Sequence, residues 1–295
     1  MKKTNYLKSR ISNDGIGLTV FSMIILLTFA LATFIPFWNV VCKAFSADWA
    51  VISGKVTLLP IGFQLKTIKT VLTGAKFINS FKMSVIITVL GSLISFFITA
   101  LVAYPLSKKH LKGMKIILML LVFTMLFNGG LIPTYLVIKK LNLNNTIWAL
   151  ILPNALSVYN MLIIKNYYEN LPASIEESAT IDGAGNLTVF FRIIAPLSKP
   201  VYATILLFVA VALWNDYYNP MIYIMSENLR PLPLYLNEIL VELAETEKTG
   251  ENSVRSISEG VRAATTIASA VPILIIYPFL QKYFVKGILI GSVKG

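Results

Sequence analysis

Residues 171–200 of the 295-residue chain read LPASIEESATIDGAGNLTVFFRIIAPLSKP, and this segment separates two long apolar stretches. Pro172 stops the preceding helix, because a residue that precedes proline is disfavoured in the helical conformation. Ser174 and Glu177 have the spacing of a capping box, which predicts a short helix over 174–182. The segment is therefore expected to hold ordered structure rather than to act as a flexible linker.

The second half of the segment predicts a turn and a second arm. Gly183 and Gly185 permit a tight turn, and the amphipathic residues 186–194 follow it. Ile175 and Ala179 are four positions apart and share one face of the predicted helix. A helix-turn-helix elbow of this kind could insert into a groove of a partner or rest on lipid headgroups, and the residues alone leave both possibilities open.

The sequence around the elbow is that of an integral membrane protein. Hydrophobic residues make up 56% of the chain and charged residues 14%, with a mean hydropathy of +0.72. Six apolar stretches approach the roughly 20 residues that a membrane helix needs, at 16–42, 79–106, 114–138, 146–164, 200–225 and 261–281. We therefore expect an all-α membrane protein with six transmembrane helices.

Three segments are expected along the chain: an N-terminus of residues 1–15, a transmembrane domain of residues 16–285 and a tail of residues 286–295. The elbow belongs to the connection at about 165–199. Basic residues and the sequence Ala30-Leu31-Ala32 give the N-terminus some features of a signal peptide. The apolar run continues well past these residues, which favours an uncleaved first span.

Lysine and arginine in short loops predict the orientation. The loop between the second and third stretches holds Lys108, Lys109, Lys112 and Lys115 and is expected to be cytoplasmic. The elbow and both termini are then cytoplasmic too. The first outer connection also contains lysines, but it is long, and long loops follow the rule less strictly. The last outer connection, about 226–260, is acidic and predicts a short amphipathic helix on the membrane surface or a partner, or a solvated lid.

The sequence lacks the residues that several other classes of function would require. The net charge of +12 is spread between apolar segments, which favours contact with anionic lipid rather than nucleic acid. The single cysteine, Cys42, and the single histidine, His110, cannot make a metal cage, and Cys42 is expected to serve packing. The chain has no phosphate-binding loop. We therefore expect no catalytic residues, no metal and no cofactor in this chain.

Polar side chains inside an apolar stretch are the leads to a solute path, because polar groups are costly in lipid. The fifth stretch ends in such a group: Trp214, Asn215, Asp216 and Tyr218. Aromatic rings and amides suit the faces and hydroxyls of a sugar, whereas an interface belt with a hydrogen-bonded aspartate is the plainer interpretation. Asn128 is a weaker candidate. A secondary transporter would usually need more intramembrane carboxylates than Asp216 alone.

Residues 177–184, ESATIDGA, followed by Ile193 and Pro196, resemble the Glu-Ala-Ala loop of ABC importer permeases. The spacing is kept, and Ser178 and Ala195 depart from the pattern. The motifs NGGLIPTY at 128–135, NTIWA at 145–149, WND at 214–216 and QKYFVKG at 281–287 resemble permeases of carbohydrate importers. The tail in particular is similar to that of the second permease subunit of maltose-type systems.

The resemblance implies a MetI-like permease fold and a subunit of an ATP-driven, binding-protein-dependent oligosaccharide importer in the bacterial inner membrane. It implies a second permease subunit in a heterodimer, a solute-binding protein outside the cell and a cytoplasmic ATPase dimer that holds ATP and Mg. The residues implied to contact the ATPase are Ile175, Glu177, Ala179, Asp182 and Gly183 in the loop and Lys286, Gly287, Lys294 and Gly295 in the tail. Alternatives are an importer permease for another solute or an autonomous secondary transporter.

Overall fold

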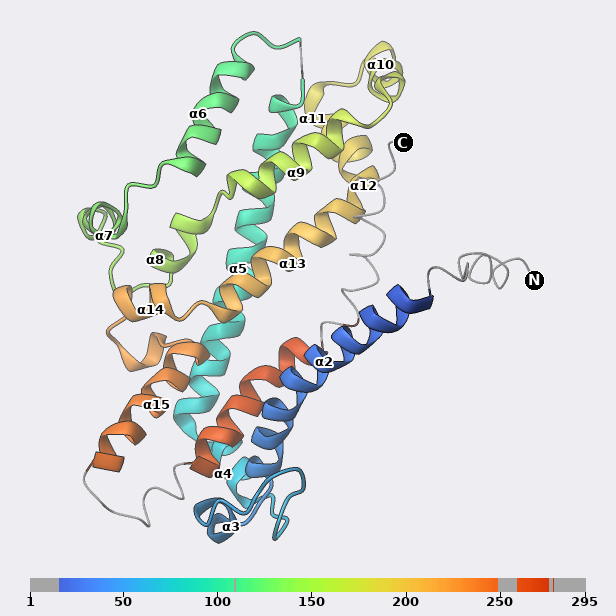
Figure 1. Ribbon diagram of the computed structural model, residues 1–295. Coiled ribbons are helices and arrows are strands. Elements are labelled where there is room, and N and C mark those ends of the chain that lie inside the picture. Colours follow the sequence, from blue (N-terminus) through green and yellow to red (C-terminus); the bar gives the residue numbers. More distant parts are fainter. Residues whose placement is uncertain (1–15, 109, 249–258, 276–277, 279–295) are drawn as a thin grey trace. The chain divides into compact units, whose positions relative to one another are not determined.

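The computed structural model describes residues 16–108, 110–248, 259–275 and 278, and the regular elements among them are helices, as predicted. The chain divides into two compact units. Unit 1 comprises residues 1–71 and 242–268, and unit 2 comprises residues 72–241 and 269–295. Figure 1 labels the elements of both units.

Unit 1 begins with α2 (Ile16–Ala44), a 29-residue helix long and apolar enough to cross a membrane. The helix runs without interruption through Ala30 and Ala32, and its apolar side chains are exposed along most of its length. A helix that is hydrophobic all round needs lipid or other helices around it. The first predicted span, 16–42, is thus present as a single helix.

Residues 45–65 form a small folded segment, here called the cap, that packs on the C-terminal end of α2 and includes α3 (Asp48–Ile52). The Trp38 indole N–H donates to the Leu58 carbonyl at 2.9 Å, and the Asn39 amide donates to the Val56 and Thr57 carbonyls at 3.0 and 2.8 Å. Cys42 is buried in the cap's apolar core, which confirms its predicted packing role; the other buried members of that core are Ala50, Val51 and Val56. α4 (Lys66–Thr73) then leads from unit 1 into unit 2.

Unit 2 is organised around α5 (Ala75–Leu106), a 32-residue helix that packs against α9 (Val158–Glu169) and α13 (Lys199–Asn215) (Figure 1). Small side chains make the close approach of these helices possible. At Gly91 a Cβ atom would lie 2.6 Å from the Cδ1 atom of Leu213. The buried core among these helices includes Met161, Ile164 and Ile205.

The predicted third and fourth stretches form bent helix pairs rather than straight helices. In the third, α6 (Met114–Leu126) and α7 (Leu131–Lys140) meet at 112°, and in the fourth, α8 (Trp148–Ile151) with η2 (Leu152–Asn154) meets α9 at 45°. The first of these bends occurs at Gly130, whose φ of +86° is a conformation that favours glycine. Breaks of this kind within membrane helices need internal hydrogen-bond partners.

The predicted fifth stretch, 200–225, is also broken, so its continuity is corrected. α13 ends at Asn215, the chain is extended at Asp216, and α14 (Tyr218–Tyr223) starts a new direction. Counting each bent pair as one span gives up to five candidate spans among the described residues. A further helix covers residues 259–275, while most of the remainder of the predicted stretch 261–281 lies outside the described residues.

The predicted amphipathic helix of the last outer connection is present, but it is longer than expected. After η4 (Glu227–Leu229), α15 runs from Leu232 to Lys248. Its first residues are packed rather than free, because the Leu232 N–H donates to the buried Ser84 hydroxyl at 2.7 Å. The start of α15 is therefore part of the core of unit 2 and not a solvated lid.

Substitution of Gly91 tests the close contact between α5 and α13. Gly91→Val should lower the free energy of unfolding by about 1–3 kcal/mol, the usual cost of overpacking, because the new side chain meets Leu213. Thermal unfolding in detergent measures the change. Gly17→Val is the control, since nothing in the described structure lies within 4 Å of its Cβ position. Equal melting temperatures for the two variants would contradict the packing described.

Candidate functional site

The first arm of the elbow is α10 (Ala173–Ile181), within one residue of the predicted helix 174–182. Its N-terminus differs in detail, because the N-cap is Pro172 and no side chain caps the first turn. Ser174 already lies inside the helix, so the predicted capping box with Glu177 does not form. The Ser174 carbonyl instead accepts a hydrogen bond from the Ser178 hydroxyl at 2.8 Å.

The turn after α10 has the hydrogen bonds of a Schellman motif. The Gly183 N–H donates to the Thr180 carbonyl at 3.0 Å, and the Ala184 N–H donates to the Ala179 carbonyl at 2.9 Å. Gly183 has a φ of +82°, which confirms its predicted special conformation. Gly185 has a φ of −72° and is extended, so the turn does not use its conformational freedom.

The second arm is anchored in the core of unit 2. It consists of α11 (Asn186–Val189), the π-helical turn η3 (Phe190–Ile194) and α12 (Ala195–Leu197), and it meets α13 at 80°. Val189, Phe190 and Ile194 are buried. Since π-turns often occur at functional sites and interrupt the regular ladder, this arm is both fixed by packing and locally irregular.

The exposed face of the elbow differs from the predicted face. Ala179 is only 8% exposed and packs in the core of unit 2, and Ile175 is half-buried. Ala179 thus turns inward in this chain and adds little to the exposed face, and the predicted contact of these residues with an ATPase stays a prediction. Ile181 is 86% exposed and Leu187 71% exposed. The outward surface is completed by Glu177, Ser178, Asp182 and Gly183.

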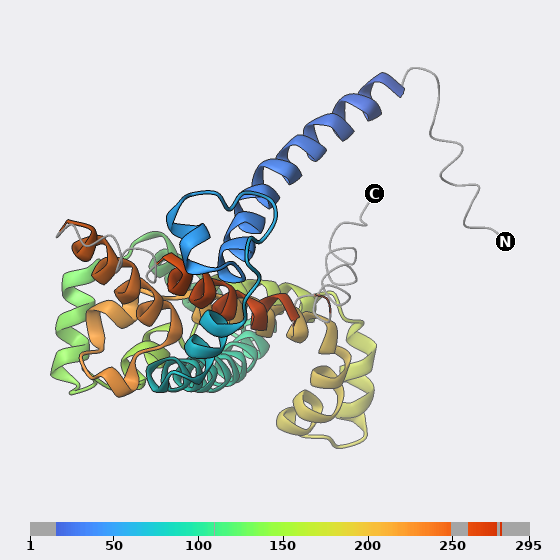
Figure 2. The same cartoon turned by 90° about the horizontal axis from the view of Figure 1, so that it is seen from below.

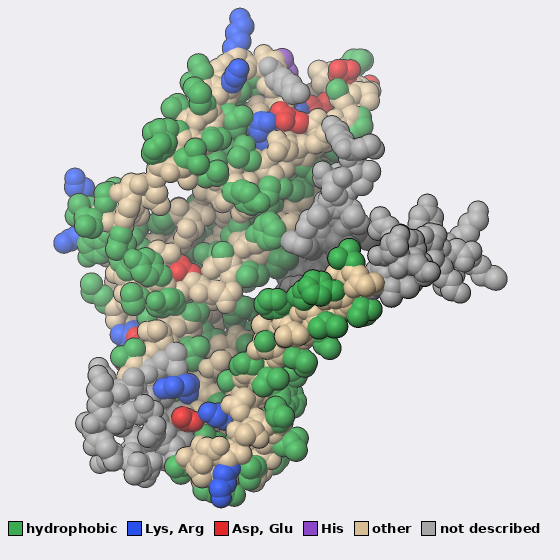
Figure 3. Space-filling view, in the orientation of Figure 1, with side chains coloured by type: hydrophobic (Ala, Val, Ile, Leu, Met, Phe, Trp, Pro, Cys, Tyr) green, Lys and Arg blue, Asp and Glu red, His purple; other side chains and the backbone are tan. Residues whose placement is uncertain are grey.

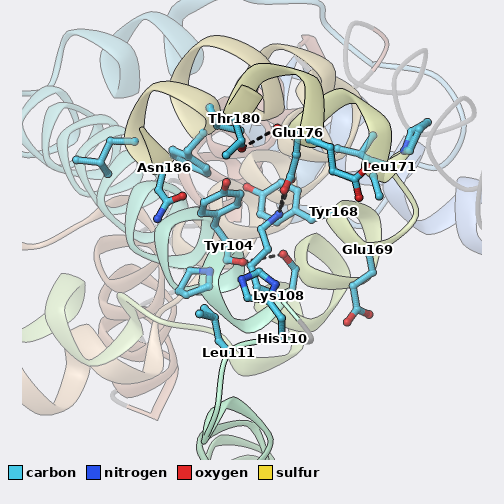
Figure 4. Close-up of a pocket in the computed structure, with 18 of the residues that line it drawn as sticks. Tyr104, Lys108, His110, Leu111, Tyr168, Glu169, Leu171, Glu176, Thr180 and Asn186 are labelled. Atoms are coloured by element: carbon cyan, nitrogen blue, oxygen red, sulfur yellow. Dashed lines mark hydrogen bonds and ion pairs between the residues drawn. The ribbon is translucent and has the colours of Figure 1, made fainter. Parts of the chain in front are cut away.

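A cleft of about 1190 Å³ lies between the elbow and the C-terminal end of α5. Tyr104, Lys108 and His110 line it on one side and Glu176 and Thr180 on the other (Figure 4). The elbow and the lysine-bearing loop, both predicted to be cytoplasmic, thus lie at the same end of unit 2. The sequence pattern pointed to Glu177 and not to its neighbour Glu176; both line this cleft.

An ion pair crosses the cleft. The Lys108 ammonium group donates to both carboxylate oxygens of Glu176, and it lies 4.4 Å from the centre of the Tyr104 ring. The side chains of Lys108 and Glu176 are 16% and 25% exposed. A partly desolvated lysine over an aromatic face is held more firmly than one in bulk water.

A second ion pair lies within α9. Lys165 pairs with Glu169 at 2.8 Å, and their side chains are 11% and 21% exposed. The connection predicted to begin at about residue 165 therefore begins later, because α9 continues to Glu169. The pair joins successive turns of one helix and bridges no other element.

The candidate solute-path residues of the fifth stretch lie at the break between α13 and α14. The Asp216 carboxylate accepts from the Asn219 backbone N–H at 3.1 Å and from the Asn219 amide at 2.7 Å. Trp214 is buried and lies edge-on to Phe81, whereas Asn215 and Tyr218 are exposed. Asp216 therefore has a structural partner, and the solute role of this group stays a prediction.

The remaining predicted positions lie apart from this break. Asn128 stands at the bend between α6 and α7, where its side-chain oxygen accepts from the Gly130 N–H at 2.9 Å. The four tail positions, Lys286, Gly287, Lys294 and Gly295, lie outside the described residues. Among the described residues, no group of three or more His, Cys, Asp or Glu side chains could hold a metal ion.

Asn145 has a role that the sequence did not reveal. Its side-chain oxygen accepts from the Met225 and Ser226 N–H groups at 3.0 and 2.9 Å, and its amide donates to the Ser226 hydroxyl at 2.7 Å. Its own N–H donates to the Tyr223 carbonyl at 2.8 Å. With a φ of +58°, Asn145 joins the loop before α8 to the end of α14. The NTIWA motif contained it, but no local pattern predicts partners 80 residues away.

Comparisons with known proteins agree with this architecture. Residues 83–226 match the family described as binding-protein-dependent transport system inner membrane component. The chain is 42% identical to protein LplC of Bacillus subtilis over 89% of this chain and 90% of the relative. It is 40% identical to the B. subtilis polygalacturonan/rhamnogalacturonan transport system permease protein YtcP over 94% and 99%.

A solved structure is also similar. It belongs to a bacterial ABC transporter involved in the import of the acidic polysaccharide alginate. The match has a TM-score of 0.84 at 32% identity and covers 92% of this chain and 98% of that chain. The fold predicted from the sequence is thus confirmed as that of an ABC importer permease.

The contribution of the Asn145 hydrogen bonds to stability can be measured by comparison with Asn142, a second asparagine with a positive φ. Asn145→Ala removes three side-chain hydrogen bonds and should destabilise the protein by about 3 kcal/mol, at about 1 kcal/mol for each bond. Asn142→Ala is the control, because Asn142 also has a positive φ, +53°, but its side chain is exposed. Thermal unfolding of both variants gives the difference, and equal losses would assign the effect to the backbone alone.

Proposed function

The chain belongs to the family of binding-protein-dependent transport system inner membrane components and is an ABC importer permease, and from this premise we propose that it imports an oligosaccharide and is driven through the α10–α11 elbow. The observation that carries the proposal is the elbow itself. It stands out from the helices of unit 2 (Figure 2). One arm is buried in the core, while exposed Ile181 and Leu187 are available to a partner.

The proposed partner of the elbow is a cytoplasmic ATPase dimer. ATP and Mg would bind to that dimer, and the residues of this chain would hold neither. Glu177 is an exposed acid on the same elbow as the exposed side chains of Ile181 and Leu187, a combination that suits a cleft with a basic residue at its rim. Closure of the ATPase would then displace α10 as a rigid body, a two-state change biased at a remote site. The Lys286, Gly287, Lys294 and Gly295 tail is proposed as a second contact.

The solute path is proposed to run along the helix breaks. Discontinuous helices place polar groups and free backbone groups inside the membrane, where transporters bind their solutes. The breaks marked by Asn128 and Asp216 are of this kind, and Trp214, Asn215 and Tyr218 add rings and an amide at the second. Two similar proteins carry names that refer to acidic polysaccharides, so oligosaccharides of uronic acids are the first solutes to test.

The remaining parts of the assembly follow the same proposal. The apolar surfaces of α2 and α6 (Figure 3) face lipid and a second, different permease subunit in the bacterial inner membrane. Both termini and the elbow face the cytoplasm, in accord with the loop lysines. A solute-binding protein docks outside, where the acidic connection around α15 offers a complementary surface. An importer of a non-sugar solute would use the same elbow but a different path.

Co-purification from detergent-solubilised membranes tests the assembly. The wild type should recover an ATPase and a second permease subunit. A Glu177→Lys variant should lose the ATPase and keep the second permease, because the exposed acid is reversed while the membrane contacts are unchanged. Lys140→Glu, at the exposed end of α7 and outside the elbow, is the control for a charge reversal and should keep both partners. If the wild type recovered neither partner in mild detergent, an autonomous transporter would become the better interpretation.

The elbow turn can be tested independently. Gly183→Val forces a β-branched residue to a φ of +82°, which should reduce the population of the native turn ~5- to 30-fold, a cost of roughly 1–2 kcal/mol. Uptake into cells should fall with it, while membrane insertion is unchanged. Gly185→Val is the matched control, because Gly185 is extended and nothing lies within 4 Å of either glycine's Cβ position in the described structure. Gly183→Asn should retain activity, since asparagine tolerates a positive φ, and normal uptake by Gly183→Val would contradict the role of the turn.

A further inference from the structure

The first arm of the elbow is held to the rest of unit 2 by few side chains. Ala179 is the buried residue of α10, all of whose residues are described. Ile175 is half-buried, and the Lys108–Glu176 ion pair links the helix to the residues that follow α5. The cleft of about 1190 Å³ separates much of α10 from the end of α5, so apolar packing does not fill this space.

The ion pair reaches a helix that is distant in sequence. Glu176 belongs to α10, whereas Lys108 follows the C-terminal end of α5, 68 positions earlier. Figure 4 shows the lysine extending between Tyr104 and the Glu176 carboxylate. Tyr104 confines the lysine on one side, since its ring lies 4.4 Å from the ammonium group. The pair is therefore a defined strut and not a loose surface contact.

α5 extends from this strut to the region of the predicted solute path. Its 32 residues make a helix about 48 Å long, at 1.5 Å per residue. Near its N-terminal end the Asn79 amide donates to the Asn228 carbonyl at 2.9 Å, and Lys76 pairs with Glu227 at 3.3 Å. These contacts hold η4, which follows α14. A displacement at Lys108 can thus reach the far end of unit 2 through one stiff helix.

Two adjacent glutamates of α10 differ in their partners. Both line the cleft, but Glu177 is exposed, whereas Glu176 is half-buried and points toward Lys108, with which it pairs (Figure 4). Successive residues of an α-helix are about 100° apart around its axis, so only one of two neighbouring acids is directed at the lysine. Because the pair is partly buried and joins two separate elements, its geometry fixes the position of α10 relative to the end of α5.

We propose that the Lys108–Glu176 ion pair passes the movement of α10 to α5, so that Lys108 and Glu176 are positioning residues for the coupling of ATP hydrolysis to transport. The proposal rests on the proposed function, in which α10 contacts an ATPase. Without the strut, α10 stays attached to the chain and to the ATPase, but α5 no longer follows it. The expected defect is futile hydrolysis: ATP is consumed while less solute is moved.

The test uses the complete importer, with its second permease, ATPase and binding protein, reconstituted in proteoliposomes. Lys108→Gln and Glu176→Gln should each lower the solute imported per ATP by about fivefold or more, the lower range of measured couplings between sites. The ATPase should still co-purify with both. The charge-reversal variants Lys108→Glu and Glu176→Lys should each lower the solute-to-ATP ratio as well. The double exchange variant that combines them should restore most of this loss, because the ion pair can form again with its charges exchanged.

The α9 pair provides a matched control, because Lys165 and Glu169 are similarly buried but lie on one helix. Lys165→Gln and Glu169→Gln should leave the solute-to-ATP ratio unchanged. A wild-type ratio in Glu176→Gln, or an exchange variant no better than the single reversals, would overturn the strut. Loss of the ATPase from Glu176→Gln would also overturn it, since Glu176 would then bind the ATPase directly. Failure of the wild type to recover an ATPase would instead reject the proposed function.

Discussion

Breaks in membrane helices are the constraint on which the rest of this structure depends. Each break frees backbone N–H and C=O groups that lipid cannot satisfy, so the chain must supply the partners itself. Three short polar side chains do so: Asn128 at the bend of α6 and α7, Asn145 at the end of α14, and Asp216 between α13 and α14. The breaks that result are stable features with fixed directions.

This arrangement separates unit 2 into stiff pieces joined at defined points. α5 is unbroken over 32 residues, whereas the elbow has a Schellman turn, a π-helical turn and an 80° bend within residues 183–199. Stiff helices carry displacement, and breaks determine where its direction changes. The second arm of the elbow packs in the core of unit 2, whereas the first arm faces the end of α5 across the cleft, and there Lys108 and Glu176 connect the two.

The sequence predicted those features whose causes are local. The helix of the first arm, the special conformation of Gly183, the packing of Cys42 and the apolar stretches all follow from patterns within a few residues. The continuity of the stretch 200–225 was predicted wrongly, because average hydropathy does not register that Asp216 can cap a new helix. The partners of Asn145 and Glu176 lie about 80 and 68 positions away, and no single-sequence pattern specifies such contacts.

The docking face was the most instructive difference. Spacing of four residues correctly placed Ile175 and Ala179 on one face of a helix, but it could not say whether that face turned outward. An apolar face on a short helix beside a membrane protein has two possible uses, its own core or a partner. Ala179 is buried in the core of unit 2 while Ile181 and Leu187 are exposed, which is why the proposed partner contact uses the latter two residues. In the proposed mechanism exposed residues of the elbow contact the ATPase, while the Lys108–Glu176 pair connects α10 to the end of α5, so binding an ATPase and responding to it would be separable properties of the chain.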